Sequence, residues 1–216
     1  MKPDAHGIEK LEPPAQAVSI AAKEVARLAR TGPDKRWAAA VDTGIAEARS
    51  LIKPRALWMP LTEDGLDGIF TGGTPVEEIA RKGKCWAFIA TIGPAVEARV
   101  REHFDAGRYL EGVILDAAGS VAVEGVCDLA EGRIAGSETS ARFSPGYCMW
   151  RLENQRGLFT LLHPEEIGIR LLPSMLMHPL KSVSGVVVRA PTEDLLVPIE
   201  ACDGCDANEC ARRRGH

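Results

Sequence analysis

The sequence has no long hydrophobic run. No apolar stretch approaches the ~20 residues that a membrane-spanning helix requires, and residues 1–14 do not combine a basic start with an apolar segment as a secretory signal does. We therefore expect a cytoplasmic protein with no membrane partner.

An excess of one charge is also missing. The chain has 26 Lys and Arg residues against 30 Asp and Glu residues, a net charge of -4, so it has no general attraction to phosphate backbones and we expect no nucleic-acid partner. With 45% hydrophobic and 26% charged residues, the composition is that of a folded globular protein. Its 216 residues fit one large domain or a domain with an appendage.

Glycine-rich nucleotide motifs are absent as well. The chain has neither G-x-G-x-x-G after a strand nor the lysine of a phosphate-binding loop, and Gly72-Gly73-Thr74-Pro75 is interpreted as a turn into a helix. Helical periodicity dominates the first part and strands come mainly later, without regular strand–helix alternation. The pattern predicts an α+β fold and gives no support to a Rossmann or kinase fold.

The expected order begins with a flexible N-terminal arm over residues 1–15, followed by a domain over residues 16–199 and a cysteine-containing tail over residues 200–216. The segment 108–130 is apolar on most sides with small residues at its middle, which predicts a deeply buried helix packed closely by others. Further helices are expected from Ser19, from Asp34, over Pro75–Lys82 and after Pro94, and strands over residues 55–60, 85–90, 171–177 and 182–188.

Three of the six cysteines lie in the last fifteen residues. Cys202, Cys205 and Cys210 form a C-x-x-C-x4-C pattern, which is close enough for a shared metal or cluster. A four-ligand site then needs Cys148, His216, solvent or another chain. The pattern is compatible with an iron–sulfur cluster acting as an electron relay, with a structural zinc, or with free thiols.

Several segments together resemble the activation domain of cobalamin-dependent methionine synthase, in a stand-alone form. The resemblance runs from about Val18 to Val188, and the arginine–PGY motif and the Ser-Val-Ser-Gly motif are its most specific parts. The segments are Ala90-Thr91-Ile92-Gly93-Pro94, Tyr109-Leu110, Leu115-Asp116-Ala117-Ala118-Gly119-Ser120 through Glu124, Arg142-Phe143-Ser144-Pro145-Gly146-Tyr147, and Ser182-Val183-Ser184-Gly185.

The resemblance implies a twisted antiparallel sheet with flanking helices that binds S-adenosylmethionine without a Rossmann motif. It further implies partnership with the cobalamin-binding module of methionine synthase. There, an electron from a flavodoxin-like or ferredoxin-like donor and a methyl group from S-adenosylmethionine would restore methylcobalamin from inert Co(II). The chain would thus be a component of a methyltransferase reaction and would need no catalytic acid or base of its own.

The same resemblance nominates the ligand-binding residues. Arg142 would take the ligand's carboxylate, since a guanidinium can hold a carboxylate through two hydrogen bonds; the alternative is a surface arginine before a turn. Pro145-Gly146-Tyr147 would bring backbone groups and an aromatic ring to the ligand. Glu124 would meet the ligand's amino group or a neighbouring positive charge, or it would instead face water, with Asp116 as a weaker candidate.

Ser184 is expected in the wall of the same site, since Ser182 and Ser184 project from one face of a strand. Beyond Val188 the sequence departs from the family pattern, with Leu195-Leu196 where the family has a tyrosine pair beside the nucleotide. Two alternatives therefore stand beside reactivation. One is a corrinoid-protein chaperone or electron relay that does not bind S-adenosylmethionine, and the other is a metal-binding adaptor with structural tail cysteines.

Overall fold

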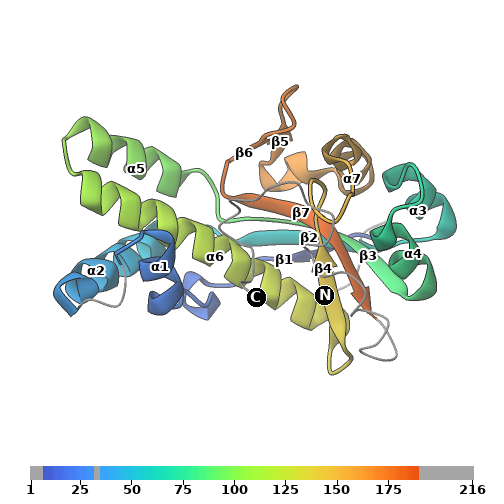
Figure 1. Cartoon of the computed structure of the whole chain (residues 1–216), viewed down its shortest axis with the longest axis horizontal. Helices are drawn as coiled ribbons and strands as arrows, with labels where there is room; N and C mark the ends of the chain where they lie inside the picture. Colours follow the sequence, from blue (N-terminus) through green and yellow to red (C-terminus); the bar gives the residue numbers. More distant parts are fainter. Residues whose placement is uncertain (1–6, 32–34, 190–216) are drawn as a thin grey trace.

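A five-stranded antiparallel sheet forms the centre of the computed structural model, which describes residues 7–31 and 35–189. Helices cover both faces of this sheet (Figure 1), so the expected α+β class is confirmed. In spatial order the strands are β1 (Glu9–Leu11), β2 (Arg55–Pro60), β3 (Lys84–Thr91), β7 (Ser182–Arg189) and β4 (Ser140–Phe143). Within the described residues, no helix has the length and hydropathy needed to cross a bilayer.

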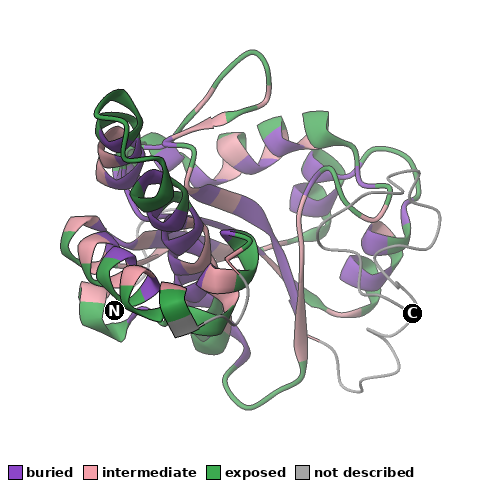
Figure 2. Ribbon diagram, turned by 60° about the vertical axis from the view of Figure 1, so that its left-hand side comes forward, coloured by how far each residue is buried: buried purple, intermediate pink, exposed green. Residues whose placement is uncertain are grey.

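One face of the sheet is covered by the longest helix, α6 (Tyr109–Ala135), together with α1 (Ala22–Leu28), α2 (Lys35–Leu51) and α5 (Ala95–Asp105). Helix α6 is buried over much of its length, as its sequence predicts (Figure 2). Its glycines mark where neighbours approach. A Cβ atom at Gly119 would lie 2.8 Å from a methyl of Val96, and one at Gly125 would lie 2.5 Å from the carbonyl oxygen of Ser19. Small residues therefore allow this packing.

The other face is covered by shorter elements, α3 (Glu63–Ile69), α4 (Pro75–Lys82), α7 (Gln155–Leu162) and the 3₁₀ turns η2 (Leu152–Asn154) and η3 (Pro164–Ile167). The predicted turn into α4 is present, since the Thr74 side chain accepts from the Glu77 backbone N–H and caps the helix. Both faces have their own apolar core, with alternate residues of the central strands contributing to each.

The prediction of one strand over residues 171–177 is wrong. The chain instead forms a hairpin of two short strands, β5 (Arg170–Leu171) and β6 (Met177–His178), which projects from the body (Figures 1 and 2). The turn is closed by Leu172 N–H donating to the Leu176 carbonyl, and Met175 has a positive φ of 66°. Apolar composition alone hides this turn, because Leu172, Leu176 and Met177 suit a strand equally well.

The expectation of a loose arm is wrong for residues 9–11, which form β1 and pair with β2 in the register Leu11↔Ala56. A three-residue edge strand is too short to show alternation. The sequence pattern also does not predict strand β4, which lies in a polar stretch, or helix α3. In each case pairing or packing with distant residues supplies the stabilisation that local sequence does not show.

We expect Gly125→Ala to destabilise the protein by about 1–3 kcal/mol, because its Cβ would press on the Ser19 carbonyl. Gly132→Ala in the same helix is the matched control. A Cβ there meets nothing within 4 Å, so the higher helix propensity of alanine should stabilise by up to about 1 kcal/mol. Urea unfolding of both variants measures the difference, and equal effects would contradict the packing of α6.

Candidate functional site

Arg142 lies on edge strand β4 and points toward α6. Its register partner on β7 is Val187, whose side chain packs into the α6-side core, and directly paired residues of antiparallel strands share a face. The guanidinium, 22% exposed, meets three carboxylates of α6. The nitrogen–oxygen distances are 3.4 Å to Glu124, 2.8 Å to Asp128 and 3.3 Å to Glu131.

The spacing of these three acids places them on one side of α6, since residues three and four apart are neighbours on a helix. Glu131 also accepts a hydrogen bond from the Ser140 hydroxyl at 2.7 Å. We call Glu124, Asp128, Glu131 and Arg142 the Arg142 cluster. With three negative charges around one positive charge, it favours an additional cation.

One donor atom of the Arg142 cluster has no acceptor among the described residues. The Nη1 nitrogen of Arg142 is buried and makes no hydrogen bond to any of them, whereas Nη2 and Nε face carboxylates. An unpaired buried N–H costs roughly 1–3 kcal/mol. A ligand oxygen at this nitrogen would remove that cost, so the cluster can serve both an anionic and a cationic group of one ligand.

The turn after β4 is fixed by its own backbone. Tyr147 N–H donates to the Ser144 carbonyl, Trp150 N–H to the Tyr147 carbonyl and Gly146 N–H to the Trp150 carbonyl. Gly146 has a φ of 90°, which glycine adopts readily. Pro145 is buried beside it, while the Tyr147 side chain is half-exposed.

Trp150 anchors this turn to the opposite core. Its indole is fully buried, donates from Nε1 to the Ile69 carbonyl at 3.0 Å and packs against Phe70 with ring centroids 4.7 Å apart. The turn thus begins beside the Arg142 cluster and ends in the core under α3. Sequence reasoning missed Trp150, although a lone tryptophan just after the motif was a signal available to it.

The structure brings Arg142 and Glu124 together, but it does not bring Ser184 to them. Ser184 lies on the same face of β7 as Val186 and Val188, whose side chains enter the core under α7. Arg142 lies on the other face, with Val187. The two faces are separated by the sheet itself. The expectation that Ser184 and Arg142 line one site is therefore not met.

A polar contact that sequence reasoning also missed joins β7 to α6. Lys181, just before β7, lies 2.8 Å from the Asp116 carboxylate and donates to the Ser120 hydroxyl at 2.8 Å. Asp116, the weaker candidate for the ligand's amino group, is thus paired with a lysine. His178 lies 3.8 Å from Glu97, a carboxylate that also accepts from the Leu180 backbone N–H at 3.1 Å.

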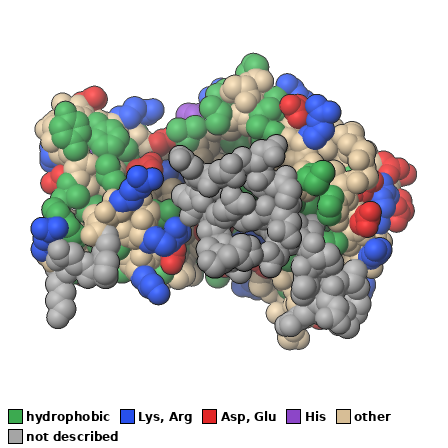
Figure 3. Space-filling model, in the orientation of Figure 1, with side chains coloured by type: hydrophobic (Ala, Val, Ile, Leu, Met, Phe, Trp, Pro, Cys, Tyr) green, Lys and Arg blue, Asp and Glu red, His purple; other side chains and the backbone are tan. Residues whose placement is uncertain are grey.

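An aromatic pair closes the turn between α5 and α6. The rings of Phe104 and Tyr109 stack with centroids 6.3 Å apart, and both side chains are partly exposed. Leu110 and Val113 of α6 are exposed in part as well, and Figure 3 shows hydrophobic side chains at its upper left, over the junction of α5 and α6. Gly112 leaves room for the Phe104 ring.

No group of three metal-ligating side chains occurs in the part of the chain that the structure describes. Of the predicted metal ligands, Cys148 is partly buried in the turn after β4, and Cys202, Cys205 and Cys210 lie outside the described residues. Two other cysteines are buried. Desolvation raises the pKa of Cys85 to about 12, and it raises that of Cys127 as well, so both stay protonated at neutral pH.

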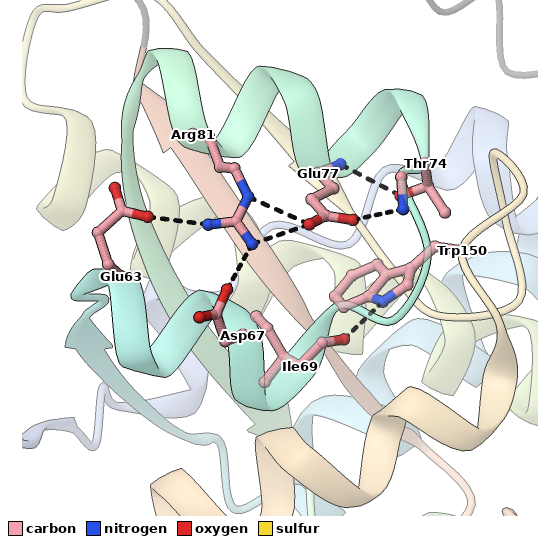
Figure 4. A network of polar contacts seen from close by, with 8 residues as sticks. Glu63, Asp67, Ile69, Thr74, Glu77, Arg81 and Trp150 are labelled. Atoms are coloured by element: carbon pink, nitrogen blue, oxygen red, sulfur yellow. Dashed lines mark hydrogen bonds and ion pairs between the residues drawn. The ribbon is translucent and has the colours of Figure 1, made fainter.

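A second ionic cluster joins α3 to α4 (Figure 4). Arg81 donates to Asp67 at 2.6 Å, to Glu63 at 2.8 Å and to Glu77 at 2.8 Å, and Glu77 also accepts from the Gly73 backbone N–H. A cavity of about 260 Å³ lies beside it, and no residue of the Arg142 cluster lines this cavity. The contacts of Arg81 hold two short helices together, which is a structural role.

We expect the contribution of Glu77 to stability to depend on pH. The hydrogen bond from Arg81 lowers the pKa of Glu77 in the folded state, so its contribution is present above the unfolded-state pKa and is lost as pH falls through the folded-state pKa. Urea unfolding should show the largest gap between wild type and Glu77→Gln at pH 7, narrowing below pH 4.

The control is Glu78→Gln. Glu78 is exposed, and its ion pair with Lys82 is long, with 4.0 Å between nitrogen and oxygen. It should change stability little at any pH. A gap for Glu77→Gln that stays constant from pH 7 to pH 3.5 would contradict the role of its charge.

Comparison with known proteins identifies the fold and the segment that carries Arg142. The family model described as "Vitamin B12 dependent methionine synthase, activation domain" matches residues 129–214. A solved structure, described as "Crystal Structure of the MetH Reactivation Domain bound to AdoHcy", is similar with a TM-score of 0.64 and 14% identity, over 88% of this chain and 82% of that one. A search of curated proteins found no significant match.

Proposed function

We propose that this chain binds S-adenosylmethionine and reactivates a cobalamin-dependent methionine synthase. Two similarities support the proposal: its residues 129–214 match the activation-domain model of vitamin B12-dependent methionine synthase, and its fold is similar to that of a MetH reactivation domain. In this function, the chain holds the ligand over Co(II) cobalamin on a partner module while the cobalt is reduced. Methyl transfer from the sulfonium of S-adenosylmethionine to the reduced cobalt would break the sulfur–methyl bond, form methylcobalamin and leave S-adenosylhomocysteine.

The unpaired Nη1 of Arg142 is the observation that carries the proposal. The methionine part of the ligand has a carboxylate that would accept from this nitrogen, and its ammonium group would be attracted by the carboxylates of Glu124 and Asp128. The whole ligand has one net positive charge, from a sulfonium, an ammonium and a carboxylate. The net negative charge of the Arg142 cluster therefore suits it.

The turn after β4 supplies the second wall of the site. Gly146 has no side chain to block an approaching ligand, and the exposed ring of Tyr147 offers a flat apolar surface beside it. Because Trp150 anchors the turn in the core, these groups are held in place before the ligand arrives. That preorganisation reduces the entropy lost on binding.

The proposed reaction requires little acid–base catalysis by residues of the chain. When bound, S-adenosylmethionine supplies the methyl group and the corrinoid supplies the nucleophile. The residues of the Arg142 cluster orient the ligand and move no proton. Holding two reactants in line can contribute up to ~7–11 kcal/mol by avoiding a bimolecular encounter, and this positioning is the role that we assign to the chain.

Calorimetry with S-adenosylmethionine and S-adenosylhomocysteine tests the binding step. We expect Arg142→Lys, which keeps the charge but loses the planar donors, to weaken affinity by about tenfold to a hundredfold. Ser184→Ala, on the opposite face of the sheet, should bind as the wild type does. Absent binding to the wild type, or an unchanged affinity in Arg142→Lys, would rule out this site.

Regeneration of methylcobalamin tests the reaction itself. A cobalamin module in the Co(II) state, a supplied reductant and S-adenosylmethionine should yield methylcobalamin, followed by its absorbance, only when the wild-type chain is present. Electron transfer without a requirement for S-adenosylmethionine would favour a relay instead. Replacing the reductant with a flavodoxin-like or ferredoxin-like protein then identifies the electron donor.

A further inference from the structure

Arg55 begins β2 on the face of the sheet opposite to Arg142. It lies on the same face of β2 as Leu57, which enters the core under α7, and it pairs directly with Thr91 of β3. The Thr91 hydroxyl is already engaged, since it accepts from the Gly93 backbone N–H and from the Ser182 hydroxyl and lies 3.3 Å from the Lys181 carbonyl. The residue beside Arg55 therefore gives it no acceptor.

Arg55 has no ion pair and no hydrogen bond with any described residue, and its Nε atom is buried. This sets it apart from the other lysines and arginines that are partly buried in the described part of the chain. Each of those has an oxygen partner: Lys10 has Glu12, Arg49 two carbonyls, Arg99 two glutamates, Arg142 three carboxylates, Lys181 Asp116 and Arg189 Glu138.

Two glycines lie beside the guanidinium of Arg55. A Cβ atom at Gly93 would lie 3.9 Å from its Nη2, and one at Gly168 would lie 3.8 Å from Nη2 and 3.9 Å from Nη1. Both glycines have a φ near 80°, at 79° and 77°, which other residues rarely adopt. The loops after β3 and after η3 thus pass the two terminal nitrogens without placing a side chain on them.

A second cation lies beside Gly93. Lys53 lies two residues before Arg55, and its Cβ would be 3.6 Å from a Cβ at Gly93. Its side chain is exposed and has no partner among the described residues. The adjacent η3 turn contains Glu165. The carboxylate of Glu165 lies 3.6 Å from the Nδ1 atom of His163, and it does not pair with Arg55 or Lys53. Lys53 and the guanidinium of Arg55 thus both lie beside Gly93, and neither has a counter-ion in the part of the chain that the structure describes.

We propose that Arg55, supported by Lys53, is a binding site for an oxyanion, either a phosphate or a carboxylate. The planar Nη1 and Nη2 donors match the two oxygens of such a group, and Lys53 adds an unsatisfied positive charge. Gly93 and Gly168 place no side chain against these donors. The oxygen atoms of the bound anion supply the hydrogen-bond acceptors that no described residue provides to Arg55.

This site does not rest on the proposed function. In the sheet register, Arg55 aligns with Ser182 of β7 through Thr91, whereas Arg142 pairs with Val187. The two arginines also lie on opposite faces of the sheet. A failure to bind S-adenosylmethionine would leave the oxyanion site intact, and the reverse also holds.

The experiment titrates the full chain with sodium phosphate at constant ionic strength and follows the NMR resonance of the Arg55 Nε–H, identified by its loss in Arg55→Lys. We expect a saturable shift, and a rise in thermal midpoint that follows the same curve. Arg55→Gln should lose about tenfold or more in affinity, and Lys53→Gln a smaller factor. Arg156→Gln, at an exposed arginine of α7, is the control and should bind as the wild type does.

A parallel titration with sodium acetate distinguishes the two sources. A shift with phosphate alone assigns the site to phosphate, a shift with acetate alone assigns it to carboxylates, and a shift with both assigns it to oxyanions in general. No saturable shift with either ion overturns the proposal. An equal rise in thermal midpoint in the wild type and Arg55→Gln also overturns it, because it would reflect salt acting elsewhere.

Discussion

The close contact of α6 with the sheet and with its neighbouring helices is the constraint on which the rest of the structure depends. Glycine at positions 119 and 125 lets the backbones approach to distances that a single added carbon would prevent. This approach buries a helix of 27 residues and fixes its rotation. Because its rotation is fixed, Glu124, Asp128 and Glu131 face β4 and meet Arg142.

The sheet separates two regions with different roles. On the α6 side, ionisable side chains gather at the edge strand β4, where they remain within reach of solvent and of a partner. On the α7 side, Trp150 and Phe70 fill the core under the turn that follows β4. The Arg142 cluster is thereby placed on a rigid support, which a positioning function requires.

The arginines of this chain show how charge is distributed between structure and function. Arg81 is surrounded by three acids and joins two helices. Arg142 is also surrounded by acids, yet one of its buried nitrogens has no acceptor, and Arg55 has no partner among the described residues. Unpaired donors of this kind are costly to keep, so they mark the positions where a ligand would be expected to contribute.

The sequence by itself determined the α+β class, a buried helix over about residues 108–130 and the motif that contains Arg142, because periodicity, small residues and turn residues act locally. It did not reveal β1, β4 or the β5–β6 hairpin, which owe their form to pairing between segments. Only the tertiary structure decided that Ser184 faces away from Arg142, since strand register sets which face a side chain takes. It alone decided that Arg55 has no partner among the described residues, because the partners of a charge come from chain segments that sequence spacing does not relate.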